Sequence, residues 1–292
     1  SRAANIIQTE HAYIAGEATF KGYEETGVEE YEYLATLDTR TSQICRDMDG
    51  KTFKLSEKVV WLNYPPLHCR CRSTTVPYFG DEESYGKRIA RDHEGKVYYV
   101  PEDMKYHEWY DKYVKGNPDE LLAEKKHKNR HADKKQYENY KKVLGKEVPR
   151  SLDEFQELKY TDDKKWKGLK DKFKVENVFN KIVQESANLH IKGIPIKNIQ
   201  RINIEQFEYA EAHINSERLH GVTKSMAQQF INEAQVAYSR WNGQVTVYVS
   251  KKGCSVVNLN TKTVSTAYRS EEYDEKFKKI LEVVDNDKMS DS

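Results

Sequence analysis

Four residues in the first quarter of the chain have side chains that bind soft metal ions or form disulfides: Cys45, His68, Cys69 and Cys71. Thiolates and imidazole are the ligands that zinc prefers in proteins. However, neither half of the group contains a C-x2-C pair, and the adjacent His68 and Cys69 cannot easily bind one ion. Nucleophilic catalysis by a Cys/His pair rests on residue type alone.

Two other interpretations of this group remain open. A disulfide could join Cys45 to Cys69 or to Cys71. Alternatively, the thiols are buried in a compact loop cluster in which Asp38, Arg40 and Asp49 form turn and cap hydrogen bonds. The sequence favours buried thiols, and it therefore predicts no metal and no cofactor.

A second group of polar residues lies near the C-terminus, as H-x4-R-x-H (His213, Arg218 and His220) and T-x-Y (Thr266 and Tyr268). Such residues could transfer protons at a phosphate group and stabilise its negative charge. They also have ordinary explanations, because exposed histidines are common on helices and a cation favours a helix C-terminus. Thr and Tyr are frequent in strands in any case.

Composition limits the elements that could position these groups. The 292 residues are 37% hydrophobic and 33% charged, against about 45% and 25% in ordinary domains. This favours small domains joined by solvated helix over one large core. The longest apolar runs fall well short of the roughly 18 residues of a membrane span, so a soluble protein is expected. Four cysteines are too few for a disulfide scaffold, and we find no signal-peptide pattern.

The net charge of +1 conceals an uneven distribution. Residues 1–104 carry 13 Lys and Arg against 18 Asp and Glu, residues 105–175 carry 20 against 14, and residues 176–292 carry 15 of each. The basic middle segment is either a solvated spacer or a surface that faces a polyanion. Acidic and basic residues alternate along it, which favours the spacer.

The N-terminal part is predicted to open with a helix over residues 2–22, ending near Gly22 or in the following turn. Because the chain has no initiator Met and begins within this helix, we expect further residues upstream. Strands are predicted over residues 31–36, from Arg72 to about Pro77, and over residues 96–100. Trp109, Tyr110 and Tyr113 should pack a helix onto the last of these strands.

The middle of the chain is predicted to be helical over residues 119–148, from Ser151 to about Leu158, and over residues 163–173 or further. Ser151 with Glu154 has the pattern of a helix start. His127 and His131 have the i, i+4 spacing of a metal pair, but a solvated face explains them better.

The C-terminal part is predicted as helix, helix, three-stranded antiparallel meander, helix. The first helix spans 205–220 and places His213 and His220 on one face. The second begins at an N-cap, Thr223, and carries an apolar series. The strands span 244–250, 254–259 and 263–268, with Val264, Thr266 and Tyr268 on one face, before a helix over 271–284. The apolar series is Met226, Phe230, Ala234, Ala237 and Trp241.

The N-terminal part contains D-x-R-T-x3-C-x2-M-D-G from Asp38, N-x-P-P-L-H-x-x-C-R-S-T-T from Asn63, and Thr9-Glu10. Through these motifs, residues 1–110 resemble the phage Mu F-like minor head (head-morphogenesis) family. The family's frequent D-x-R-T-C-x-x-C pattern has Ser42 in place of its first cysteine here. The resemblance implies a virion component, present in few copies near the portal and capsid proteins and often ejected with DNA into the host cytoplasm.

Residues 200–284 resemble the phage branch of the barnase–EndoU–colicin–RelE nuclease superfamily, through the order of elements, H-x4-R-x-H and T-x-Y. Members are metal-independent RNases or nuclease-like toxins. The resemblance implies a catalytic set of His213, Arg218, His220, Thr266 and Tyr268. The domain could equally have kept nucleic-acid binding without catalysis.

The sequence therefore predicts an α+β protein with two small α+β domains and a charged helical connector. The predicted parts are residues 1–116, a basic connector over 117–200, a nuclease-like domain over 201–284 and a polar tail over 285–292. The predicted function is that of a phage minor head protein, with DNA or RNA contacted through the Lys-rich connector and the C-terminal domain. The alternatives are a metal-independent effector RNase, acting through the C-terminal domain, and a catalytically inactive nucleic-acid-binding protein that acts after entry.

Overall fold

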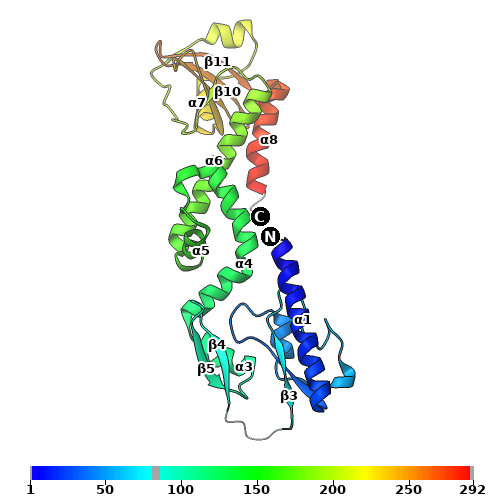
Figure 1. Cartoon of the computed structure of the whole chain (residues 1–292). Helices are drawn as coiled ribbons and strands as arrows, with labels where there is room; N and C mark the ends of the chain where they lie inside the picture. Colours follow the sequence, from blue (N-terminus) through cyan, green and yellow to red (C-terminus); the bar gives the residue numbers. More distant parts are fainter. Residues whose placement is uncertain (1, 81–85, 290–292) are drawn as a thin grey trace. The chain divides into compact units, whose positions relative to one another are not determined.

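A computed structural model describes residues 2–80 and 86–289 and divides the chain into two compact units, residues 1–136 and 137–292. Figure 1 shows the course of the chain from helix α1 to helix α8. Helices and small, mostly antiparallel sheets make up both units, which confirms the α+β class. No described helix is long and apolar enough to cross a membrane.

The first unit begins with α1 (Arg2–Thr26), followed by a three-stranded antiparallel sheet in the order β2-β1-β3. Its central strand is β1 (Glu30–Leu34), flanked by β2 (Thr52–Lys54) and β3 (Thr74–Tyr78). The predicted first helix is therefore confirmed as α1. The strands predicted over residues 31–36 and from Arg72 to about Pro77 are confirmed as β1 and β3, with ends shifted by a few residues. The sheet side chains of Tyr31 and Tyr33 are fully buried.

A hairpin and a short helical segment complete the core of this unit. Strands β4 (Lys87–Arg91) and β5 (Val97–Pro101) pair antiparallel, and α3 (Tyr106–Trp109) runs on into a π-helical turn, Tyr110–Val114. The buried Trp109 donates its indole N–H to the Tyr98 hydroxyl at 2.7 Å, and Tyr98 packs against Tyr113. The predicted packing of these aromatic residues onto the strand is confirmed.

The three middle helices form where predicted, as α4 (Pro118–Leu144), α5 (Leu152–Thr161) and α6 (Asp163–Asn188). Ser151 caps α5 by accepting a hydrogen bond from the backbone N–H of Glu154 at 3.1 Å. Within the second unit, α5 and the first half of α6 share a core centred on Phe155 with Tyr137, Tyr140, Leu144, Val148, Trp166 and Leu169.

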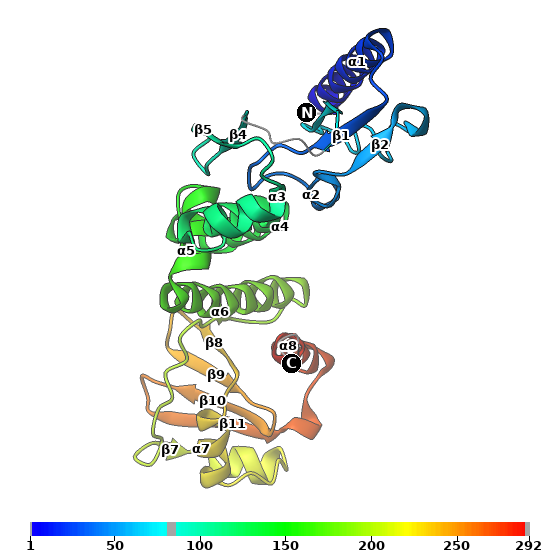
Figure 2. The same ribbon diagram turned by 90° about the horizontal axis from the view of Figure 1, so that it is seen from below.

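The second unit contains a six-stranded sheet in the order β6-β8-β9-β10-β11-β7 (Figure 2). Helix α7 (Lys224–Asn232) packs on one face, and the end of α6 with α8 (Glu275–Met289) packs on the other. The strands are β6 (Ile194–Pro195), β7 (Glu208–Tyr209), β8 (Val236–Arg240), β9 (Val245–Val249), β10 (Gly253–Asn258) and β11 (Thr263–Arg269). The predicted meander corresponds to β9, β10 and β11, and the predicted last helix to α8.

Two predicted helices are wrong in length. Residues 205–220 do not form one helix: Glu208–Tyr209 pairs in parallel with β11, and only Ala212–Glu217 is helical, as a short π-helix. The second helix starts at its predicted cap, with Thr223 accepting from the N–H of Met226 at 3.2 Å, but it ends at Asn232. Of the rest of its apolar series, Ala234 lies just before β8, Ala237 lies in β8 and Trp241 lies in the turn after it, because β8 pairs with β6 and β9.

The predicted alternation of β11 is also wrong. The pairing with β10 shifts register between Val256 and Val257, so Ser265 is an extra residue in the ladder. As a result Val264 and Ala267 enter the core beneath α7, whereas Tyr268 packs into the core on the α8 face. A bulge of this kind moves all following side chains to the opposite face. Val264 therefore does not share a face with Tyr268.

Candidate functional site

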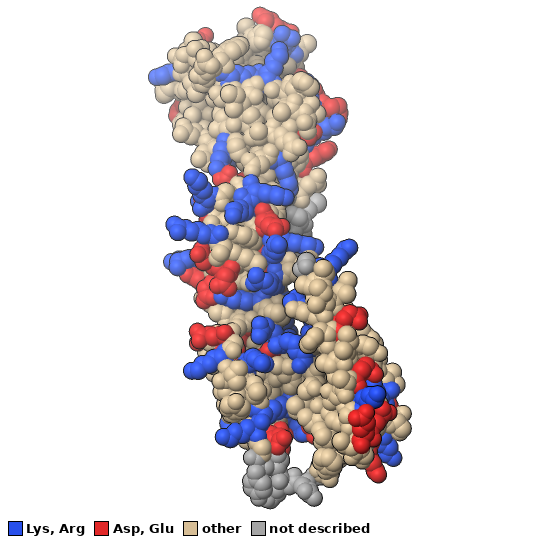
Figure 3. Space-filling view, viewed as in Figure 1, with Lys and Arg blue, Asp and Glu red and all other residues tan. Residues whose placement is uncertain are grey.

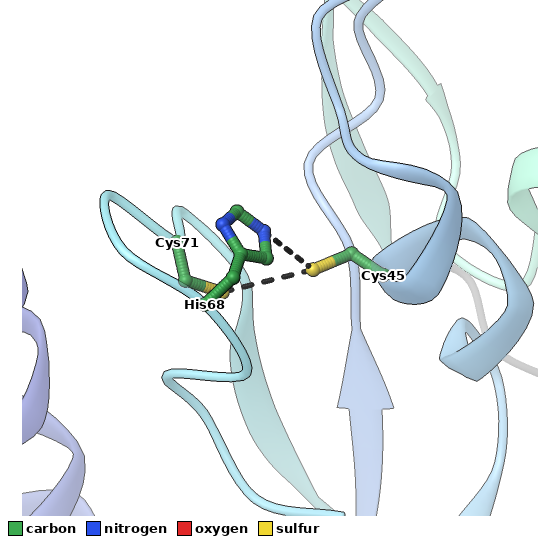
Figure 4. A group of neighbouring side chains, drawn as sticks. All are labelled: Cys45, His68 and Cys71. Carbon is green, nitrogen blue, oxygen red and sulfur yellow. Dashed lines mark hydrogen bonds between the residues drawn. The ribbon is translucent and has the colours of Figure 1, made fainter. Parts of the chain in front are cut away.

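In the first unit, three side chains that could bind a metal ion meet, and they come from two short segments. Helix α2 (Gln43–Met48) carries Cys45, and the loop before β3 carries His68 and Cys71. The loop makes a tight turn in which the N–H of Cys71 donates to the carbonyl of His68 at 3.1 Å. Cys45 therefore lies next to His68 and Cys71, which are 23 or more positions further along the chain (Figure 4).

The ligand atoms of Cys45, His68 and Cys71 all lie within 4.8 Å of one another. The two sulfur atoms are 3.7 Å apart, and His68 Nε2 lies 3.2 Å from Cys45 Sγ. Both cysteines are buried and free, and the Tyr33 hydroxyl donates to Cys45 Sγ at 3.3 Å. Cys69, in contrast, is exposed and contributes only its backbone carbonyl, which lies 2.8 Å from His68 Nδ1.

The hydrogen bond between the two thiols shifts their pKa values in opposite directions. The contact with Cys45 is the main cause of a lowered pKa at Cys71, and backbone N–H groups of the loop act in the same direction. The contact with Cys71, together with burial, raises the pKa of Cys45. The arrangement therefore favours one thiolate, on Cys71, with Cys45 as the thiol that donates to it.

An ion-pair network holds the loop beside the thiols. Arg72 donates to both carboxylate oxygens of the buried Asp38. Asp38 also accepts from the N–H of Arg40 at 2.9 Å and from the Thr41 hydroxyl at 3.2 Å. These are the turn hydrogen bonds that the sequence predicts for Asp38. Asp49 instead accepts from the backbone N–H groups of Ala35 and Tyr106, so it ties β1 to α3.

The Asp38 network gives a testable dependence of stability on pH. Burial alone would raise the pKa of Asp38, but the hydrogen bonds from Arg72 and the charges of Arg72 and Arg40 outweigh it and lower the pKa. The unfolded chain therefore binds the proton more tightly, so this contribution is complete above the ordinary value of about 4 and is lost as pH falls through the lowered pKa. Denaturant unfolding followed between about pH 2 and 5 should show stability rising with pH. Asp38→Asn should flatten that rise, and an unchanged slope would contradict the assignment.

A small pocket of about 40 Å³ opens beside the thiols. Cys45, His68 and Ser42 line it, together with three arginines, Arg40, Arg70 and Arg72. Arg70 also links the loop to α1, since its backbone N–H donates to Thr9 Oγ1 at 3.0 Å and its Nε to Gln8 Oε1 at 2.8 Å. The pocket has room for about one water molecule.

Of the five residues predicted as a catalytic set in the C-terminal part, His220 and Tyr268 are the pair whose side chains the structure brings together. His220 Nδ1 lies 2.7 Å from a carboxylate oxygen of Glu272, and the His220 and Tyr268 rings are 5.6 Å apart. His213 pairs with Glu217 at 2.9 Å, and Arg218 is exposed. Thr266 lies opposite Val256 in the β10–β11 ladder and is half-buried.

The expected shared helix face of His213 and His220 is wrong. The short helix ends at Glu217, and Leu219 and Gly221 both adopt positive φ angles of 60°. The Asn215 side chain closes this loop by donating to the carbonyl of Val222 and accepting its N–H, each at 3.0 Å. His220 is thereby directed to Glu272 and Tyr268, outside the helix that carries His213. His127 and His131, the other predicted pair, are exposed on α4.

Sequence reasoning missed two features of these groupings. In the first unit the sequence analysis weighed only C-x2-C as a ligand pair. His68-x2-Cys71, which it quotes as part of a family motif, has two ligand types at the same spacing, with Ser42-x2-Cys45 as its counterpart. In the second unit it missed Glu272, which follows β11 in a short 3-10 turn, Ser270–Glu272. The x2 spacing was visible in the sequence, whereas the contact with Glu272 depends on the tertiary fold.

Comparisons with known proteins bear on the first unit alone. No curated protein and no solved structure matches the chain. The resemblance of residues 200–284 to nucleases finds no support in these comparisons. Residues 1–76 match the family described as Phage Mu protein F like protein, which supports the N-terminal resemblance and suggests a phage head-morphogenesis protein and virion component.

Proposed function

We propose that this chain is a minor protein of a phage head that is packaged with the genome and ejected with it into the host cytoplasm. The observation that carries the proposal is the family match over residues 1–76. The match covers α1, the three-stranded sheet up to most of β3, and the Cys45–His68–Cys71 cluster. Portal and capsid proteins are the partners that such a protein would contact.

Mass spectrometry of purified particles tests packaging and ejection separately. Peptides from both units should be found in full particles, at few copies relative to the major capsid protein. After ejection is triggered in vitro, the same peptides should be depleted from the emptied particles. Absence from full particles would refute the virion assignment, and retention in emptied particles would refute ejection alone.

Nucleic-acid contact through the basic helices is the second part of the proposal. Figure 3 shows Lys and Arg side chains along the middle helical segment, interspersed with acidic ones. On α6, Lys164, Lys167 and Lys170 are exposed at a spacing of three residues, so they project from adjoining faces of the helix. Phosphate contacts require only placed cations, and each releases counterions on binding.

Charge reversal of these three lysines to glutamate should weaken DNA binding and reduce its salt dependence. The slope of log K against log salt should fall by about 0.9 for each phosphate contact that is lost. A matched control reverses the exposed Lys262, Lys276 and Lys279 elsewhere in the second unit. Equal weakening by both triple variants would show a nonspecific charge effect and refute the connector as the contact surface.

An RNase activity of the second unit is the other candidate function, favoured by the proximity of His220 to Glu272 and Tyr268. A carboxylate partner could orient His220 for proton transfer at a phosphate. Purified protein would then cleave RNA in the presence of EDTA. His220→Ala should abolish cleavage, and His213→Ala should reduce it if His213 belongs to the site. The enzyme proposal fails if wild-type protein leaves RNA intact.

A further inference from the structure

We propose that Cys45, His68 and Cys71 bind one Zn²⁺ ion, with a fourth coordination position open beside Ser42. Two thiolates and an imidazole form a soft ligand set that suits zinc. The proposal concerns the metal chemistry of the first unit and does not depend on whether the chain is packaged, ejected or bound to nucleic acid.

The spacing of the ligand atoms matches a tetrahedral ion. With bonds of about 2.3 Å to sulfur and about 2.0 Å to nitrogen, tetrahedral zinc sets two sulfurs about 3.8 Å apart and a sulfur and a nitrogen about 3.5 Å apart. The Cys45 and Cys71 sulfurs are 3.7 Å apart, and Cys45 Sγ is 3.2 Å from His68 Nε2. A disulfide would require the same sulfurs to approach to about 2.05 Å.

The histidine is already held in the orientation that metal binding requires. His68 Nδ1 lies 2.8 Å from the carbonyl oxygen of Cys69, which fixes the proton on Nδ1. The lone pair of Nε2 is then directed towards Cys45 and Ser42. A histidine that donates its second N–H to a backbone carbonyl is the usual outer-shell arrangement of a zinc site.

Ser42 defines the fourth position. Its hydroxyl lies 2.8 Å from His68 Nε2, so the fold brings residues 42, 45, 68 and 71 together as two x2 pairs. Serine is not among the usual zinc ligands. The adjoining pocket of about 40 Å³ has room for the water that would complete the coordination.

A bound ion would join parts of the chain that are distant in sequence. It would fasten α2 to the loop before β3, and that loop contacts α1 through Arg70 and Thr9. The ion would therefore stabilise the first unit in the manner of structural zinc sites, whose binding energy is folding energy.

Cobalt substitution of the full-length protein tests the site directly. The reduced, metal-free protein, titrated with Co²⁺, should develop a thiolate-to-cobalt charge-transfer band and tetrahedral d–d bands that saturate at one equivalent. Added Zn²⁺ should displace the cobalt and bleach both bands. Cys45→Ser and Cys71→Ser should each lose the charge-transfer intensity of one thiolate and bind more weakly.

Cys69→Ser is the matched control, because Cys69 is adjacent in sequence but exposed and faces the site with its carbonyl alone. It should bind Co²⁺ as wild type does. Ser42→Cys should supply the missing ligand, add a third thiolate band and tighten zinc binding.

The proposal is overturned if wild-type protein shows no thiolate–cobalt band, or if Cys69→Ser removes the band as completely as Cys45→Ser. An EDTA-insensitive Cys45–Cys71 disulfide, formed in air in place of metal binding, would also overturn it. Because the wild-type titration needs no variant, a variant that fails to fold leaves the test intact. Unchanged affinity in Ser42→Cys would refute the assignment of the fourth position.

Discussion

Replacing Asp49 by alanine is expected to lower the free energy of unfolding of the first unit by about 3–5 kcal/mol. The side chains of Asp49 and Arg88 are 1% and 4% exposed, and their ion pair is 2.6 Å long. Asp49 also accepts from the backbone N–H groups of Ala35 and Tyr106, each at 2.7 Å. The substitution leaves the Arg88 charge buried without its carboxylate and two N–H groups without their acceptor.

Native-state hydrogen exchange of the full chain measures this loss, because it resolves the amides of β1 and β4 from those of the second unit. Amide exchange in β1 and β4 should accelerate by the factor that corresponds to the lost free energy of unfolding. Exchange in β9 and β10 should stay unchanged. Asp47→Ala, at an exposed position on the same helix as Cys45, is the control and should change stability by less than about 0.5 kcal/mol. Similar exchange in both variants would contradict a structural role for the buried pair.

Replacing Phe155 by alanine is expected to cost the second unit about 3–5 kcal/mol. Phe155 is fully buried, and its ring lies 5.4 Å from that of Tyr137, 5.6 Å from that of Tyr140 and 5.2 Å from that of Trp166. Removing the ring leaves a cavity among the aromatic side chains that surround it. The helices α5 and α6 would lose the centre of their shared core.

Hydrogen exchange and tryptophan fluorescence measure this effect. Protection of α5 amides should decrease most, and Trp166 emission should shift as its surroundings become wetter. Phe155→Leu fills most of the space and should cost less than about 1.5 kcal/mol. Val175→Ala, at a side chain that is 56% exposed on α6, serves as the surface control. If Phe155→Ala behaves like the surface control, the aromatic cluster does not stabilise this unit.

The helices that depend on local sequence were predictable, whereas segments whose structure depends on pairing with distant strands were not. For α4, α5 and α6, periodicity and caps such as Ser151 agree with the tertiary environment, so their positions follow from the sequence alone. Helix α1 forms where predicted although Ile6, Ile7 and Ile14 are exposed. The predicted helix over 205–220 failed because Tyr209 pairs with β11, more than 50 residues further along the chain. Likewise, Ala234 and Ala237 fit a helical period, but Ala237 lies in a strand that β6 and β9 flank.

The candidate sites divide in the same way. The sequence supplied the residue types at Cys45, His68 and Cys71 and the motifs that match the phage head family. It could not show that these three side chains meet while Cys69 faces outward, because that depends on how the loop turns against α2. In the second unit it supplied His220 and Tyr268 but not Glu272, and it wrongly paired His220 with His213.

By itself, the sequence determined the α+β class, the long helices, the meander of β9 to β11 and the head-protein motifs, because these depend on local periodicity, turn chemistry and residue identity. The tertiary structure alone decided which ligand atoms converge, which face of β11 each side chain occupies after its bulge, and where His220 points. Those features depend on contacts between residues that are far apart in the chain. Local periodicity carries no information about such contacts, because their geometry is set by the packing of complete elements.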